Sequence, residues 1–243
     1  YLPFPLMIEQ ESARVITDYV RGGGRVISEA CPALFGDGGY TQVLNPGYGL
    51  HEVFGARAEN GPDSIHAAPP SIHWAGRDVQ CTVHRQRITP IGASVLAEYS
   101  DGGAAVVENS FGEGRAVLIG TYPGICLEWG IEDAARMIVD FARRLGVRPR
   151  AAASDPDVRI RVHSCGDGLL IFAVNLSPED KQVEMLFDDG IQFDAAVDLM
   201  NGQPIERGFT TLTIGARDAR VLRAPRQALT ASRDKAICFT EKG

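Results

Sequence analysis

The chain has 243 residues, of which 44% are hydrophobic and 23% charged, a balance typical of a folded globular protein with one large domain or two ordinary ones. Its net charge of −7 argues against a nucleic-acid partner, because phosphates bind to basic surfaces. No apolar run approaches the roughly 20 residues that a membrane-spanning helix needs, so we expect no membrane partner either.

The chain opens on a short segment with two prolines, residues 1–7, that runs straight into a helical pattern at residues 9–21. Glycines 22–24 end this pattern. Residues 25–30 form an apolar run of the kind found in buried parallel strands, which need partners on both sides. The sequence therefore predicts the C-terminal portion of a larger protein, with its upstream strands missing.

Residues 31–49 are glycine-rich and irregular, and a loop of that length in a compact domain is usually functional or lies at an interface. A short helix is expected at residues 49–55, with an apolar buried side. Residues 64–83 show short strand patterns broken by prolines and a glycine.

Three strands joined by glycine turns are expected at residues 95–99, 104–109 and 115–121. A second amphipathic helix is expected over residues 128–145, with Gly146 as its stop. Its predicted buried face consists of Ile131, Ala135, Ile138, Phe141, Ala142 and Leu145. Residues 1–150 thus read as an α/β domain.

Beyond residue 150 the helical pattern stops. Short strand patterns separated by turn residues recur up to about residue 225, which predicts a small antiparallel β-sandwich over residues 151–225. The tail, residues 226–243, has no periodicity and is expected to wrap the surface or to be disordered.

The order of these features resembles the family 42 glycoside hydrolases, the bacterial β-galactosidases. Four segments are similar to successive pieces of that family's trimerisation domain: DYVRGGGRVISEA, ALFGDGGY, GLHEVFG and AEYSDGGAAVVENSFGEGRAVLIGTYPG. Two more, GLLIFAVNLSPEDKQVEML and DLMNGQPI, are similar to its C-terminal β-sandwich. The resemblance covers roughly residues 5–225. It implies an incomplete flavodoxin-like domain, of the class I glutamine amidotransferase type, followed by the sandwich.

The resemblance also implies a function. The chain would be a non-catalytic oligomerisation and accessory region of a cytoplasmic β-galactosidase-like enzyme of carbohydrate metabolism. It would hold subunits in a homo-oligomer, a trimer, through the α/β domain. The family's catalytic barrel, with its two glutamates about 5 Å apart, would precede this chain and is absent from it. Glu59-Asn60 and Glu108-Asn109 reverse the Asn-Glu order of the family's acid/base, so no catalytic residue is assigned.

Cys31 supports an alternative, a small amidotransferase-like hydrolase or transferase. It directly follows the strand pattern at residues 25–30, where that fold places a nucleophile activated by a histidine. Its neighbours Glu29, Ala30 and Pro32 are not the glycines of a nucleophile turn, and His51-Glu52 lies in a packing helix. A structural thiol is therefore the favoured interpretation of Cys31.

The remaining polar candidates do not suggest a metal or a cofactor. The cysteines show no C-x-x-C pair, which favours reduced, mostly buried thiols over disulfides or zinc; they are Cys31, Cys81, Cys126, Cys165 and Cys238. The histidines lack metal-ligand spacing, although His66, His73 and His84 could meet in space; the others are His51 and His163.

Aromatic side chains could stack on sugars, and Trp74 and the tyrosines Tyr40 and Tyr48 are the candidates. Packing is the favoured role for Trp74, and Trp129 is predicted to be a core anchor. A carbohydrate-binding module in residues 151–225 is a second alternative, but this segment contains no Trp or Tyr to form a stacking platform. Asn175-Leu176-Ser177 fits a glycosylation acceptor and is interpreted as a strand end.

Overall fold

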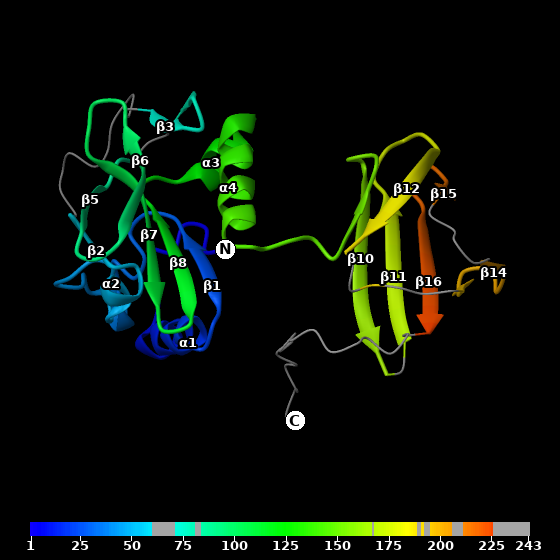
Figure 1. The fold of residues 1–243 in the computed structure, drawn as a ribbon, viewed down its shortest axis with the longest axis horizontal. Helices are drawn as coiled ribbons and strands as arrows, with labels where there is room; N and C mark the ends of the chain where they lie inside the picture. The colour runs from blue at the N-terminus through cyan, green and yellow to red at the C-terminus, as the bar shows by residue number, and fades with distance from the viewer. Residues whose placement is uncertain are drawn as a thin grey trace. The chain divides into compact units, whose positions relative to one another are not determined.

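The computed structural model describes residues 1–59, 71–80, 84–166, 168–188, 191, 195–205 and 211–225. The chain divides into two compact units, Tyr1–Val147 and Arg148–Gly243, each with its own core (Figure 1). Asn60, His66, Cys81, Cys238 and the 226–243 tail lie outside the described residues.

The first unit is built on a mixed, mostly antiparallel sheet. Its strand order is β1 (Arg25–Ser28), β8 (Gly114–Ile119), β7 (Ala104–Phe111), β6 (Ser94–Tyr99), β3 (Ile72–Trp74) and β4 (Arg77–Val79). β2 (Ala56–Glu59) joins through β5 (Arg87–Pro90), which also pairs with β7. The expected strands at residues 95–99, 104–109 and 115–121 are confirmed as β6, β7 and β8.

Among the paired strands that the structure describes in this sheet, only β1 and β8 run parallel. β1 runs parallel to β8, whereas the strand pairs from β8 to β4 are antiparallel. Tight glycine turns connect β6 to β7 and β7 to β8, and such turns allow only antiparallel neighbours. On its other edge β1 makes one isolated parallel bridge, from Ser28 to Leu2.

Helices cover both faces of this sheet. Neighbouring strand residues point to opposite sides, so an apolar run presents side chains to both faces, and each face needs a cover. Val26 packs with α1 (Gln10–Arg21) and α2 (Leu50–Val53). The next residue, Ile27, packs with Met137 and Phe141 of α4 (Glu132–Arg144), which runs alongside the sheet in Figure 1. The helices expected at residues 9–21 and 49–55 are confirmed as α1 and α2.

The helix expected over residues 128–145 is confirmed as α4, but it begins only at Glu132. A separate short helix, α3 (Pro123–Glu128), precedes it with Trp129 as its C-cap, and Gly130 then adopts φ of 75° before α4 begins. Such a left-handed conformation suits glycine and cannot continue a helix. Trp129 is 61% exposed, so its prediction as a core anchor was wrong.

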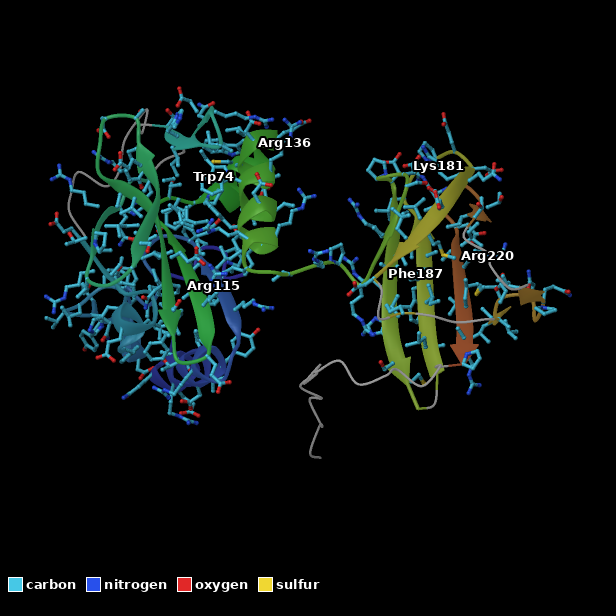
Figure 2. The ribbon with its side chains drawn as sticks, viewed as in Figure 1. Trp74, Arg115, Arg136, Lys181, Phe187 and Arg220 are labelled. Atoms are coloured by element: carbon cyan, nitrogen blue, oxygen red, sulfur yellow. The ribbon has the colours of Figure 1, made fainter. Side chains whose placement is uncertain are left out.

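The predicted buried face is confirmed in part: Phe141 and Leu145 are buried, whereas its other members are half-buried. The side chains of α4 itself supply the rest of the buried face. Its fully buried side chains are Ala134, Met137 and Phe141. Trp74 packs against Phe141 with ring centroids 4.5 Å apart, and Figure 2 shows its position beside α4. The packing role expected for Trp74 is therefore confirmed.

The described residues of the second unit form two antiparallel sheets around one core. The first has the order β10 (Val158–Cys165), β11 (Gly168–Asn175), β16 (Ala219–Pro225), β13 (Ala196–Asp198) and β14 (Pro204–Ile205). The second has the order β15 (Thr211–Ile214), β12 (Lys181–Phe187) and β9 (Ala151–Ala153). Ile171 and Leu222 from the first sheet and Met185 from the second belong to the same buried cluster.

Ion pairs and hydrogen bonds hold strands and loops of this second unit together. Asp198 is fully buried, forms an ion pair with Arg220 and accepts a hydrogen bond from the Met200 amide at 2.8 Å. The ammonium of Lys181 lies 3.1 Å from the Asp155 carboxylate. Arg220 and Lys181 are labelled in Figure 2.

None of the helices in the described part of the chain is long and apolar enough to cross a membrane.

Candidate functional site

A small three-stranded patch connects the N-terminal segment to the long loop after β1. Met7 forms a parallel bridge with Phe35, and Phe35 forms an antiparallel bridge with Thr41. The Phe35 amide donates to the Leu6 carbonyl at 2.9 Å, and the Gln42 amide donates to the Leu34 carbonyl at 2.9 Å. The long loop expected at an interface therefore has a fixed backbone.

The two faces of this patch differ because side chains alternate along an extended backbone. Leu6 and Leu34 face inward and pack against the buried cluster of Ala30, Cys31 and Tyr122. Met7 and Phe35 are bridge partners and belong to the opposite face. We call them, together with Val43 two positions after Thr41, the outer face. Met7 is 68% exposed and Val43 is fully exposed.

Two further apolar side chains, Tyr40 and Leu44, are exposed in the same loop. Tyr48 stabilises the loop, because its hydroxyl accepts a hydrogen bond from the Asp37 amide at 2.8 Å. Any side chain at Gly36 would collide with this hydroxyl. A preformed surface that gathers exposed apolar side chains is typical of protein–protein contact sites.

A second feature lies under this patch, where Cys31 meets His84. The Cys31 Sγ is 3.3 Å from the His84 Nε2, although 53 positions separate the two residues in the chain. The Cys31 backbone has φ of 59°, and its amide donates to the Gln86 side chain at 2.9 Å. The histidine partner that the local sequence lacked is thus supplied by a distant segment.

The thiol of Cys31 is protonated in this environment. Burial raises the pKa of the Cys31 thiol to about 11, although a hydrogen bond with Tyr122 acts in the opposite direction. Cys31 is only 2% exposed and His84 only 9% exposed. At neutral pH the Cys31 side chain is therefore a neutral thiol within hydrogen-bond distance of the His84 ring.

The three other histidines that the structure describes have different surroundings. His73 is exposed and lies 3.1 Å from Asp78, so it does not meet the buried His84 as the sequence had suggested. His163 is exposed and lies edge-on to Phe172, and His51 is half-buried on α2. In the described part of the chain, no three His, Cys, Asp or Glu side chains gather as a metal site would require.

The Glu108-Asn109 pair has a structural role. Glu108 is buried, and its carboxylate forms ion pairs with Arg115 and with Arg144, whose Nε lies 2.7 Å away. Figure 2 labels Arg115 in this unit. Asn109 donates to the carbonyls of Glu52 and Val53 at the end of α2. Glu59 is exposed on β2.

Asn175 closes a strand, as its sequence context predicted. It is the last residue of β11 and is 1% exposed. Its side-chain amide donates to the carbonyls of Glu179, Ile214 and Gly215, and its oxygen accepts from the Ser177 amide. A nitrogen with three buried acceptors is not available to carry a sugar.

Comparison with known proteins connects the first unit to a family. The sequence profile of the β-galactosidase trimerisation domain matches residues 1–146. The chain belongs to this family. The resemblance to family 42 glycoside hydrolases is thereby confirmed, and the outer face lies within the matched residues.

Similar proteins extend the likeness into the second unit. The β-galactosidase LacA of Lactobacillus acidophilus is 25% identical over 201 residues, which cover 76% of this chain and 27% of LacA. The crystal structure of a β-galactosidase from Bacillus circulans sp. alkalophilus has a TM-score of 0.70 at 22% identity, over 91% of this chain and 32% of that one. Gan42B, a GH42 β-galactosidase from G. stearothermophilus, has a TM-score of 0.69 at 18% identity, over 92% of this chain and 31% of its own. The chain thus spans about a third or less of these relatives.

Proposed function

We propose that the α/β unit holds copies of this protein together in a homo-oligomer, a trimer, and that its outer face is a contact surface between copies. The observation that carries the proposal is the fully exposed Val43 beside Met7, on a fixed backbone within the segment that matches a trimerisation domain. A rigid apolar surface loses little conformational entropy when it is covered, which favours association.

The size of the driving force follows from the area covered. Apolar surface contributes about 25 cal/mol per Å² removed from water. A stable interface buries about 800 Å² on each partner, of which the central apolar side chains carry most of the energy. Met7, Val43 and the half-buried Phe35 would belong to such a centre, and the exposed Tyr40 and Leu44 of the same loop add apolar surface.

The second part of the proposal concerns the whole protein. We infer that the chain is a non-catalytic accessory region of a β-galactosidase-like glycoside hydrolase of carbohydrate metabolism, with the catalytic barrel outside this chain. The relatives named β-galactosidases, each about three to four times longer than the matched region, support this inference. No residue described here is assigned to glycosidic bond cleavage, and no cofactor is proposed.

Two finer features belong to the same proposal. The incomplete flavodoxin-like architecture is supported by the parallel β1–β8 pair, with helices packed on both faces of the sheet. A cytoplasmic location is supported by the free thiols of Cys31, Cys126 and Cys165, since reducing compartments keep thiols free. The net charge of −7 supports partners other than nucleic acid.

The proposal is tested by placing a charge on the outer face. Val43→Asp should convert the oligomer to the 26.2 kDa monomer, because association would bury an unpaired carboxylate at the interface. Size-exclusion chromatography with light-scattering detection measures the mass. The matched control is Leu176→Asp, at an exposed leucine of the second unit, which should leave the mass unchanged. Equal masses for Val43→Asp and the unmodified chain would refute the assignment of the outer face.

A further inference from the structure

The Cys31–His84 pair has the geometry of a nucleophile and its base. A side chain that reacts covalently is usually within hydrogen-bond reach of a group that accepts its proton, and the base is oriented by a third group. Here the Sγ–Nε2 separation is 3.3 Å, and the His84 ring lies against Tyr122 with centroids 5.0 Å apart. Thr121 fixes the same segment by donating its hydroxyl to the His84 carbonyl at 2.8 Å.

The backbone at Cys31 is held in a strained conformation. A left-handed φ of 59° is unfavourable for a non-glycine residue, and it persists only where the surroundings enforce it. The Gln86 side chain does so, because its oxygen accepts from the Cys31 amide while its nitrogen donates to Asn45 at 2.7 Å. Strain of this kind is concentrated at reactive and ligand-binding positions.

Residues 1–6, which we call the strap, pack against the cluster that contains Cys31. Phe4 packs on Tyr122 with ring centroids 4.8 Å apart, and Leu6 packs on the cluster of Ala30, Cys31 and Tyr122. Phe4 itself remains 53% exposed, so the strap lies between this cluster and solvent. The strap is tied down by the buried Glu29, which accepts from the Tyr1 hydroxyl and from the Phe4 amide at 2.8 Å.

We propose that Cys31 and His84 form a latent covalent modification site for small electrophiles, and that release of the strap activates it. With the strap lifted, water solvates the ion pair that proton transfer from the thiol to the His84 Nε2 creates. The thiolate sulfur then attacks the electrophilic carbon. With iodoacetamide as the probe, a C–S bond forms as the C–I bond breaks, iodide leaves, and the proton on His84 passes to water. This site is separate from the assembly function and takes no part in cleaving sugars.

The test measures the alkylation rate of each cysteine by iodoacetamide in the full chain, using peptide mass spectrometry. Phe4→Ala removes the cover on Tyr122 and should accelerate alkylation of Cys31 on the order of tenfold or more. Tyr1→Phe, which removes one tie to Glu29, should give a smaller acceleration. Cys126, which is 1% exposed in the same unit, should stay slow in every variant.

A second variant tests whether His84 assists the reaction of Cys31 or whether exposure of the thiol alone explains the faster rate. Adding His84→Gln to Phe4→Ala should slow Cys31 alkylation by about fivefold or more, because the base is lost. An unchanged rate in this double variant would overturn the proposal, as would Phe4→Ala leaving Cys31 slow. Acceleration of Cys126 together with Cys31 would also overturn it, because the unit would then be unfolding as a whole. Equal acceleration by Val43→Asp alone would show that assembly, not the strap, closes the site.

Discussion

Met7 pairs with Phe35 through a parallel bridge, and this pairing decides which side chains of the long loop face outward. It turns Leu6 and Leu34 into the core and leaves Met7 and Val43 exposed. A local backbone pairing between the first residues and a loop thus creates the apolar surface on which the proposed assembly depends.

Phe141 anchors α4 on one face of the sheet in the first unit. It is fully buried and packs against Trp74, so Phe141→Ala should lower the free energy of unfolding by about 3–5 kcal/mol. Val139→Ala, at a 45% exposed position of the same helix, should change it by less than about 0.5 kcal/mol. Urea unfolding followed by tryptophan fluorescence measures this unit alone, since both tryptophans lie in it. Similar losses in both variants would contradict the packing described.

Asn175 should be the polar residue on which the second unit depends most. Asn175→Ala leaves three carbonyls and one amide without their partner and should cost about 2–4 kcal/mol. The neighbouring Leu176→Ala, at a 59% exposed side chain, serves as the control and should be nearly neutral. Calorimetry should show a lower melting temperature for the second unit in the first variant only. A shift of the same size in the control would count against this assignment.

The buried thiol gives stability a specific dependence on pH. Above pH 9 the unfolded chain loses the Cys31 proton, whereas the folded chain keeps it because burial raises the thiol pKa to about 11. The contribution of Cys31 to the free energy of unfolding is constant well below pH 9. It declines as the pH rises, by about 2 kcal/mol between pH 9 and 11. Burial also raises the pKa of the adjacent Tyr122, so the comparison must keep that residue.

Cys31→Ala is the variant that isolates this dependence. The difference in unfolding free energy between the unmodified chain and Cys31→Ala should shrink as the pH is raised from 9 to 11. Urea titrations at several pH values measure it. Titration of groups that do not interact with Cys31 cancels in the difference, whereas Tyr122, whose pKa is raised first by burial and then by Cys31, also contributes to it. A difference that stays constant over this range would show that the thiol is not protected from ionisation.

The chain alone should release no sugar from a nitrophenyl galactoside. Retaining hydrolysis requires two carboxylates about 5 Å apart on either side of the bond, and the proposal places them in the barrel outside this chain. Glu108, the buried glutamate of β7, is occupied by Arg115 and Arg144. A full-length family 42 β-galactosidase assayed in parallel is the positive control. Sugar release that stays with the purified chain through several columns would contradict the accessory role.

Local patterns in the sequence predicted the elements that local chemistry determines. Glycine turns and alternating side chains located β6, β7 and β8, and the helical spacing located α1. The break at Gly130 was missed because the apolar spacing continues across it from α3 into α4. Trp129, placed in the core on that basis, lies instead on the exposed side of the break.

Long-range contacts could not be read in the same way. Cys31 and His84 are 53 positions apart, and neither the Cys31 flanks nor the spacing of His84 indicates that they meet. The loop after β1 was expected at an interface, but its outer face depends on the bridge from Met7 to Phe35, which no periodicity reveals. The resemblance to family 42 enzymes identified the unit, and the fold then showed which side chains are free to associate.

The molar mass of the unmodified chain in solution tests the central claim most directly. Sedimentation equilibrium at micromolar concentration should give a single species of three times the 26.2 kDa chain mass, dissociated by Val43→Asp and unaffected by Leu176→Asp. A species of 26.2 kDa for the unmodified chain under the same conditions would contradict assembly through the outer face.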